Sequence, residues 1–328
     1  MSASSEHIVI FILSIGGLWL GSRLLVDAAV IIARKGGLSE LVIGLTIVAV
    51  GTSTPELVVS ADAAVSGFGS IAVANVLGSN IFNLALVLGG VSLLQAVPVE
   101  RSLIHRDGLA LLGATAVVGV TLLMSEGTIG RVHGLVFLLL IGGYLVFLIH
   151  TERSHPSMST EYSNVPEISL DTIVDRVPIP GAATYGCILL CGLAIVLVSG
   201  HYLVSSAVAI AAAAGISEWT IGETIVAAGT STPELVVSIV AVRSGHIGMA
   251  VGNVFGSCIF NLLGILGVAA ILNPLVMGNS AVQTLGWLSI VSIAMVGALW
   301  SGNTLSRVEG VIFVSAELIR WVVRLIGY

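Results

Sequence analysis

The sequence predicts an all-α membrane protein with ten transmembrane helices in two inverted-topology five-helix repeats. Three observations support this fold class: the composition, the length of the apolar runs, and a stretch that occurs twice. Hydrophobic residues make up 56% of the 328 residues, charged residues make up 9%, and the mean hydropathy is +1.09. These values are typical of helical membrane proteins. The apolar runs are continuous rather than alternating, which excludes a transmembrane β-barrel.

A membrane-spanning helix needs about 20 mostly apolar residues. Ten segments meet this rule, at roughly 8–33, 39–66, 70–96, 107–125, 129–150, 181–213, 217–243, 247–272, 281–301 and 307–326. The polar segment 151–180 is predicted to be a cytoplasmic loop that separates a first half, 1–150, from a second half, 181–328. The first apolar run has no basic segment before it, so we interpret it as a retained helix rather than a cleaved signal.

The duplicated stretch occupies 44–90 and again 222–268, and the two copies align without a gap. The repeats as wholes cover about 41–90 and 219–268. Five predicted crossings separate equivalent positions, and because five is odd, the two copies enter the membrane in opposite directions. Inverted repeats are the architecture of many secondary transporters, whose binding site lies near the membrane midplane where helices are interrupted.

The distribution of basic residues predicts the orientation. With an extracytoplasmic N-terminus, the cytoplasmic basic residues are Arg34, Lys35, Arg101, Arg106, Arg153, Arg176, Arg243 and Arg307. The extracytoplasmic ones are Arg131, Arg320 and Arg324. This bias favours placing both termini outside the cytoplasm.

Each repeat carries the sequence Gly-Thr-Ser-Thr-Pro-Glu near the middle of a predicted span, at 51–56 and 229–234. Proline lacks an amide donor and crowds the carbonyl four residues earlier, so the helix is expected to be interrupted here. Freed backbone groups at membrane depth are tolerated only where they face protein or a wet cavity. Glu56 and Glu234 stand beside these interruptions, and a carboxylate at that depth predicts a functional site.

Carboxylate, hydroxyl, amide and carbonyl oxygens are hard ligands that suit Ca²⁺ and Na⁺. The two glutamates would neutralise one Ca²⁺. Without a cation their burial would be costly, which favours obligatory exchange over leak and predicts competition by protons. Taken alone, each hydroxyl is also compatible with ordinary packing between membrane helices.

A second motif in each repeat reads GSNIFN or GSCIFN. Ser79 and Asn83 are four residues apart and therefore share a helix face, as do Ser257 and Asn261. These faces can supply further oxygen ligands to the same centre. The glycine before each serine would permit close approach of helices.

Together, these paired motifs resemble the α-repeats of the sodium/calcium exchangers in the cation/calcium antiporter superfamily, and they look most like the compact prokaryotic members. The resemblance covers both repeats, the ten-span plan and the length. It implies an antiporter that exchanges Na⁺ for Ca²⁺ by alternating access across a bacterial inner or archaeal plasma membrane, with no cofactor. It further implies four central cation sites, one for Ca²⁺ and the others for Na⁺, and sliding of the first and sixth helices, about 8–33 and 181–213.

Carried over by position, the resemblance assigns the central carboxylates, the hydroxyl and amide ligands, and two outer carbonyl ligands for Na⁺. The cation ligands are Glu56, Glu234, Thr52, Thr230, Ser53, Ser231, Ser79, Ser257, Asn83, Asn261, Ala49 and Ala227.

The chain departs from the family pattern at three positions. Well-studied relatives carry an acid at the position of Asn261, so this site has two carboxylates rather than three, and the ion stoichiometry and driving ion are open. Cys258 stands where the first repeat has Asn80. Glu223 stands where the first repeat has Leu45, and it is either a solvated helix-end carboxylate or part of an entrance vestibule.

Other charged residues inside the spans are interpreted as internal pairs: Arg23 with Asp27, and Glu317 with Arg320. Asp62 is either a solvated helix end or a residue that lines an ion path.

Three alternatives remain beside Na⁺/Ca²⁺ exchange. The driving ion could be H⁺ or K⁺, and the protein could be a cation channel, although inverted repeats favour alternating access over a channel. A membrane enzyme is disfavoured, because no catalytic pairing or nucleotide-binding loop is found. No basic run suits nucleic acid, so the expected partners are Ca²⁺, Na⁺ and lipid, with a single chain as the functional unit.

Overall fold

The computed structural model describes residues 3–36, 40–125, 127–154, 181–213 and 218–325. They form a helical protein with four very short strands. The first part contains α1 (Ala3–Gly36), α2 (Glu40–Ile43), the π-helix η1 (Gly44–Val48), α3 (Ala49–Thr52), α4 (Thr54–Val65), α5 (Gly69–Ile81), η2 (Phe82–Leu88), α6 (Gly89–Leu94), β1 (Val97–Pro98), α7 (Arg101–Leu103), η3 (Ile104–Gly108), α8 (Leu109–Met124), β2 (Thr128–Ile129) and α9 (Arg131–Ser154).

The second part repeats this order of elements, except that the single helix α17 stands where the first part has α7, η3 and α8. It contains α11 (Gly181–Ala213), α12 (Glu218–Thr220), η4 (Ile221–Val226), α13 (Ala227–Thr230), α14 (Thr232–Arg243), α15 (Ile247–Ile259), η5 (Phe260–Ile265), α16 (Leu266–Leu272), β3 (Leu275–Val276), α17 (Asn279–Gly302), β4 (Thr304–Leu305) and α18 (Arg307–Leu325). The predicted loop 151–180 lies outside the described residues apart from the end of α9.

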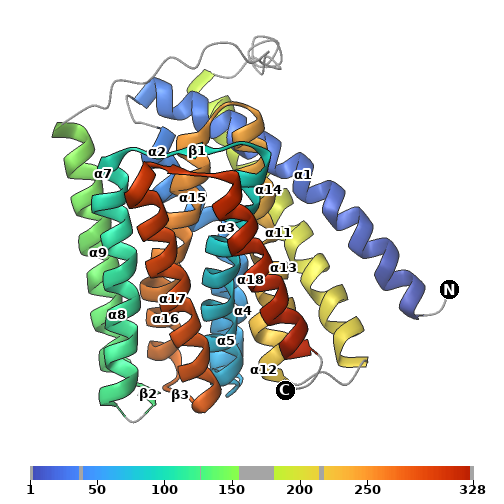
Figure 1. Cartoon of the computed structure of the whole chain (residues 1–328). Helices are drawn as coiled ribbons and strands as arrows, with labels where there is room; N and C mark the ends of the chain where they lie inside the picture. Colours follow the sequence, from blue (N-terminus) through green and yellow to red (C-terminus); the bar gives the residue numbers. More distant parts are fainter. Residues whose placement is uncertain (1–2, 37–39, 126, 155–180, 214–217, 326–328) are drawn as a thin grey trace.

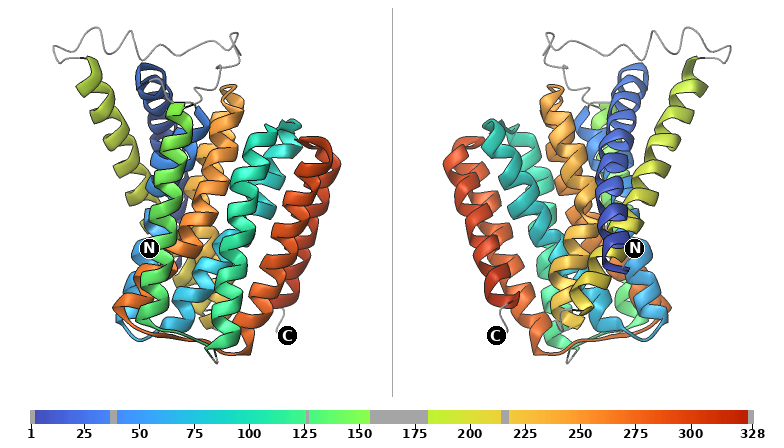
Figure 2. Two further views of the ribbon diagram at one scale, coloured as in Figure 1. Left: turned by 90° about the vertical axis from the view of Figure 1, so that its left-hand side faces the viewer. Right: turned by 90° about the vertical axis from the view of Figure 1, so that its right-hand side faces the viewer.

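The long helices α1 and α11 lie side by side at one edge of the molecule, away from α8 and α9 (Figures 1 and 2). They cross where two glycines meet. A Cβ atom at Gly21 would lie 2.8 Å from the carbonyl oxygen of Gly192, and a Cβ atom at Gly192 would lie 2.9 Å from that of Gly21. Larger side chains at this crossing would force the two helices apart.

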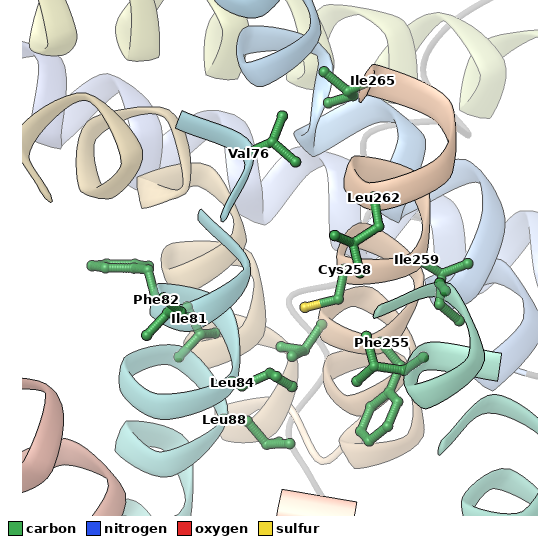
Figure 3. Close-up of a cluster of buried hydrophobic side chains, with 14 of the residues drawn as sticks. Val76, Ile81, Phe82, Leu84, Leu88, Phe255, Cys258, Ile259, Leu262 and Ile265 are labelled. Atoms are coloured by element: carbon green, nitrogen blue, oxygen red, sulfur yellow. The ribbon is translucent and has the colours of Figure 1, made fainter. Parts of the chain in front are cut away.

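The middle of the molecule is formed by α5 with η2 and by α15 with η5, whose apolar side chains face each other (Figure 3). The buried side chains of this cluster include Val76, Ile81, Leu84, Phe255, Ile259 and Leu262. Moving an apolar side chain from lipid into the protein gains little free energy, so the association of these helices depends on close packing. The predicted role of the glycines is confirmed: a Cβ atom at Gly78 would lie 2.3 Å from the Glu223 carbonyl oxygen, and one at Gly256 would lie 2.6 Å from that of Leu45.

Two short antiparallel strand pairs join the loops between helices. β1 pairs with β4, with Val97 opposite Leu305, and β2 pairs with β3, with Ile129 opposite Leu275. The β1 pair lies at one end of the helical bundle and the β2 pair at the opposite end (Figure 1). The loop after α6 in the first part is therefore on the same side as the loop after α17 in the second part.

Five helices of the described residues are long and apolar enough to cross a membrane: Gly69–Leu94, Arg101–Met124, Arg131–Leu148, Ile247–Leu272 and Asn279–Gly302. The pair Gly44–Thr52 and Thr54–Val65 is a sixth candidate, bent by 49°. The chain is therefore a multi-pass helical membrane protein. The predicted interruption of the span 39–66 is confirmed, and the predicted span 107–125 begins earlier, at Arg101.

Candidate cation-binding site

Both Gly-Thr-Ser-Thr-Pro-Glu motifs break their helices at the serine. Ser53 separates α3 from α4 with φ −81° and ψ 8°, and Ser231 separates α13 from α14 with φ −84° and ψ 5°. The proline then opens the following helix, where its missing amide proton costs no internal hydrogen bond. Glu56 and Glu234 consequently lie in the first turns of α4 and α14, where the helix dipole favours a negative charge.

The two broken helices exchange hydrogen bonds with each other. Ser53 Oγ donates to Glu234 Oε1 at 2.8 Å, and Ser231 Oγ donates to Glu56 Oε1 at 2.8 Å. All four residues are fully buried. Each repeat therefore supplies a carboxylate to one common centre and a hydroxyl to the carboxylate of the other repeat.

The threonines of the motif form a second reciprocal set. Thr52 Oγ1 lies 3.1 Å from Asn253 Oδ1, and Thr230 Oγ1 lies 3.2 Å from Asn75 Oδ1. Each of these contacts also joins the two repeats. The threonines are therefore held by amide groups from α5 and α15, so their backbone carbonyls are fixed next to the serine break.

Asn75 and Asn253 are structural residues of the site that the motifs did not identify. Asn75 Nδ2 donates to Ser60 Oγ at 3.0 Å, and Asn253 Nδ2 donates to Ser238 Oγ at 3.1 Å. Both asparagines are fully buried. The duplication could have identified them, because Ser60 and Asn75 of the first copy correspond to Ser238 and Asn253 of the second copy.

The serines of the second motif also lie at the centre. Ser79 Oγ is 3.5 Å from the carbonyl oxygen of Ala227 and 3.4 Å from the hydroxyl of Thr230. Ser257 Oγ is 3.5 Å from the carbonyl oxygen of Ala49 and 3.3 Å from Glu234 Oε1. The two alanine carbonyls therefore border the same set of hydroxyl groups.

Several buried polar atoms of the predicted ligands have no hydrogen-bond partner among the described residues. They are Glu56 Oε2, Glu234 Oε2, and both side-chain amide atoms of Asn83 and of Asn261. Buried polar groups are nearly always satisfied, because leaving one unpaired costs free energy. Oxygen atoms of this kind are the ligands that Ca²⁺ and Na⁺ take. Every predicted ligand residue is thus buried, and oxygens of Glu56, Glu234, Asn83 and Asn261 have no hydrogen-bond partner among the described residues.

Cys258 contacts Asn80, its counterpart in the first repeat. Asn80 Nδ2 donates to the Cys258 carbonyl oxygen at 3.1 Å, and Cys258 Sγ lies 3.8 Å from the Asn80 carbonyl oxygen. The departure from the family pattern at this position is therefore a contact between α5 and α15 beside the site.

Both environments predicted for Glu223 are wrong. It is neither a solvated helix end nor part of an open vestibule, because it is fully buried and forms an ion pair with Arg320. Arg320 and Arg324 both lie in α18 and face Glu223. The predicted pairing of Glu317 with Arg320 is confirmed, with 2.6 Å between Oε1 and Nη2. The side chain of Arg23 lies outside the described residues, and Asp62 is exposed.

Known proteins that resemble this chain include cation exchangers and an antiporter. A family model described as sodium/calcium exchanger protein matches residues 6–150 and 184–319. The chain belongs to the sodium/calcium exchanger family. This exchanger is 36% identical over 311 residues to the putative antiporter CaxA of Alkalimonas amylolytica, with 91% of this chain and 92% of that protein covered. It is 31% identical over 332 residues to the sodium/calcium exchanger MaX1 of Methanosarcina acetivorans, with 93% and 95% covered.

A solved structure of the sodium-calcium exchanger NCX_Mj, soaked with Na⁺ and Sr²⁺, matches this exchanger with a TM-score of 0.79 at 30% sequence identity, covering 98% of this chain and 99% of that chain. The inner membrane protein YrbG of Escherichia coli is 34% identical over 252 residues, with 76% of this chain and 75% of that protein covered. Cation/calcium antiport is therefore the class of activity that the family supports, since CaxA is named as a putative antiporter and MaX1 and NCX_Mj as exchangers.

Proposed function

We propose that this chain exchanges Na⁺ for Ca²⁺ across a cell membrane by alternating access. The observation that carries this proposal is the buried centre shared by Glu56 and Glu234. Each carboxylate accepts a hydrogen bond from a serine of the other repeat, and each retains one oxygen with no partner among the described residues.

The charge of this centre favours exchange over free conduction. Two buried carboxylates offset the charge of one Ca²⁺ or of two Na⁺. A centre that released its cation and received none would hold two uncompensated charges at membrane depth, at a cost of several kcal/mol. A change of access is therefore easiest when a cation occupies the site.

We assign the ligands as follows. Glu56 and Glu234 are the central carboxylates, and the hydroxyl and carbonyl groups of the two motifs surround them. Asn83 and Asn261 supply neutral amide oxygens. The carbonyls of Ala49 and Ala227 serve outer Na⁺ sites. Because Asn261 is neutral, the site has two charges to share among its cations, which limits how much positive charge it can hold at once.

We also propose that the ten spans form two inverted halves. The strand pairing supports this arrangement: the loop after α6 pairs through β1 with the loop after α17, rather than with the loop after α16. The tight glycine crossing of α1 and α11 supports a role for this pair as the elements that slide. The expected location is the plasma membrane, with both termini outside the cytoplasm and one chain as the functional unit.

Uptake of radioactive Ca²⁺ into proteoliposomes tests this function. The vesicles are loaded with Na⁺, with K⁺, or with buffer at lower internal pH. Internal Na⁺ is expected to drive uptake, and Glu56→Gln and Glu234→Gln are each expected to abolish it. Glu100→Gln, at an exposed carboxylate, is the matched control and should transport normally.

The outcomes separate the alternatives. Uptake driven by K⁺ or by the proton gradient would replace the coupling ion but retain the site. Uptake without any internal cation would indicate a channel. Normal transport by the two glutamine variants would overturn the proposed site.

A further inference from the structure

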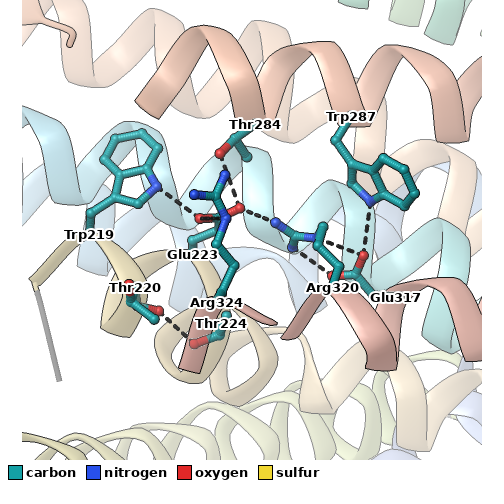
Figure 4. A network of polar contacts seen from close by, with 9 residues as sticks. All are labelled: Trp219, Thr220, Glu223, Thr224, Thr284, Trp287, Glu317, Arg320 and Arg324. Atoms are coloured by element: carbon teal, nitrogen blue, oxygen red, sulfur yellow. Dashed lines mark hydrogen bonds and ion pairs between the residues drawn. The ribbon is translucent and has the colours of Figure 1, made fainter. Parts of the chain in front are cut away.

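A second buried polar network lies outside the cation site, where η4, α17 and α18 meet (Figure 4). The guanidinium group of Arg320 is its centre. It donates to Glu223 through Nη1 and to Glu317 through Nη2 and Nε, the last two at 2.6 and 2.9 Å. Glu223 is 0% exposed and Glu317 is 1% exposed. One arginine therefore bridges two buried carboxylates from different helices.

Further groups complete the network. Glu223 accepts hydrogen bonds from Trp219 Nε1 at 2.8 Å and from Thr284 Oγ1 at 3.0 Å, and Arg324 Nε lies 3.9 Å from its Oε2. Trp287 Nε1 donates to Glu317 Oε2 at 3.0 Å. Two carboxylates and two guanidinium groups balance in charge. Because both Glu223 oxygens are engaged by protein groups, this carboxylate is not available as a ligand for a transported cation.

Two sets of contacts connect this network to the candidate cation site. Glu223 lies four residues before Ala227 on the same broken helix, and its carbonyl oxygen packs against Gly78, next to Ser79. On α18, the residue after Arg320 is Trp321. Its ring stacks on that of Phe82, with centroids 6.0 Å apart, and Phe82 immediately precedes Asn83.

The first repeat has the same backbone geometry without these charges. Leu45 takes the place of Glu223, and its carbonyl oxygen packs against Gly256 in the same way. Arg320 lies thirteen residues after the arginine that opens α18, and the equivalent position in α9 is Tyr144. Tyr144 donates to Asp107 of η3 at 2.8 Å, and thus to the neighbouring span rather than to the broken helix. The charge network therefore distinguishes the two halves and is not required by the fold of a repeat.

We propose that Arg320 and Glu223 are positioning residues that hold the second broken helix against α18, and thereby set cation affinity on the Ala227 side of the site independently of the Ala49 side. This inference rests on the proposed function. An ion pair buried between η4 and α18 fixes the position of η4 because separating the two charges would leave both unpaired. Any movement of η4 shifts the Ala227 carbonyl and the groups around Ser79.

The tryptophans supply a spectroscopic test. Trp219 and Trp287 are hydrogen-bonded within the network, and Trp321 stacks on Phe82. Because coupling between two sites is reciprocal, Ca²⁺ binding should alter the network. Ca²⁺ titration of the purified full chain is expected to change tryptophan fluorescence, and Trp219→Phe and Trp287→Phe assign the change. Glu234→Gln is expected to abolish it.

Transport supplies the second test, in the same proteoliposome assay. Arg320→Met and Glu223→Leu, which copies the first repeat, are expected to raise the half-saturating Ca²⁺ concentration about 5-fold or more, the lower range for coupled sites. Arg320→Lys retains the charge, so its half-saturating Ca²⁺ concentration should lie between that of these variants and that of the wild type. Tyr144→Phe, at the equivalent position of the first half, should stay within about 2-fold of wild type. If Arg320→Met does not fold, the triple variant Glu223→Leu, Glu317→Leu and Arg320→Met replaces three charged side chains by apolar ones and is used for the test instead.

Unchanged half-saturation in Arg320→Met and Glu223→Leu, with only a lower melting temperature, would show a purely structural network and overturn the inference alone. An equal effect of Tyr144→Phe would overturn the claimed difference between the halves. A wild-type chain that neither transports nor binds Ca²⁺ would overturn the proposed function and this inference together.

Discussion

Ser53 donates a 2.8 Å hydrogen bond to Glu234, a residue 181 positions later in the chain. The equivalent bond from Ser231 to Glu56 has the same length. This reciprocity means that neither repeat can form the carboxylate centre alone, because each orients the acid of the other.

Removal of either serine hydroxyl should weaken cation binding to a similar extent. Hydrogen bonds to charged groups contribute about 1.5–3 kcal/mol. Ser53→Ala and Ser231→Ala are therefore each expected to raise the half-saturating Ca²⁺ concentration by about 10-fold or more. Thr54→Ala is the matched control, because the Thr54 hydroxyl donates to the carbonyl of Val50 in the same repeat and not to a carboxylate. A large effect of Thr54→Ala, or none of the serine variants, would contradict this account.

A third carboxylate at the position of Asn261 should change the number of Na⁺ or protons that are exchanged for each Ca²⁺. In Asn261→Asp the buried charge exceeds that of one Ca²⁺, so an additional Na⁺ or proton is expected to accompany it. The measurement is the membrane potential at which net Ca²⁺ flux is zero, taken at several Na⁺ gradients. A stoichiometry identical to wild type would show that Asn261 does not determine the charge held by the site.

Amide groups that hold the threonines should contribute to stability. Asn75→Ala removes contacts with Ser60 and Thr230, and Asn253→Ala removes those with Ser238 and Thr52. Each variant loses two buried hydrogen bonds, and a typical hydrogen bond contributes about 0.5–1.5 kcal/mol. Thermal unfolding in detergent should show a lower melting temperature for both variants. An unchanged melting temperature would indicate that these asparagines are not part of a stabilising network.

Close helix approach at the glycines can be tested by a single added methyl group. In Gly78→Ala and Gly256→Ala the new Cβ would lie 2.3 and 2.6 Å from backbone carbonyl oxygens, so the helices must separate. Overpacking of this kind costs about 1–3 kcal/mol, and transport should fall sharply. Gly90→Ala is the control, since nothing lies within 4 Å of a Cβ atom there. Normal transport by both site variants would show that the close approach is not needed.

Cations should protect the folded chain against heat, because a ligand that binds only the folded state stabilises it by mass action. Ca²⁺ at about 100 times its dissociation constant is expected to add about 2.7 kcal/mol. Protons compete for the same carboxylates, so a lower pH should raise the Ca²⁺ concentration required. The Glu56→Gln and Glu234→Gln variants should lose the Ca²⁺-dependent rise in melting temperature. A rise that persists in both would place the Ca²⁺ ligands elsewhere.

The sequence by itself determined the class of the protein, the interruption of two spans, and the residue types available to the candidate site. These properties depend on composition, on proline and glycine, and on a duplication, all of which act locally or can be compared along the chain. Within the second motif, Ser79 lies near the Ala227 carbonyl oxygen and Ser257 lies near Glu234, as the shared helix face of each motif suggests.

Tertiary structure decided which groups meet. Nothing local indicated that Ser53 would bind the distant Glu234 rather than its own Glu56, or that Asn75 would hold Thr230. The sequence also left Glu223 without a partner, because Arg320 lies on a helix 97 positions away. Such contacts depend on how the two halves cross, and a membrane fixes the direction of each helix but not its neighbours. The crossing is set by close packing at glycines and by pairing of buried polar groups, both of which arise only when the helices are assembled.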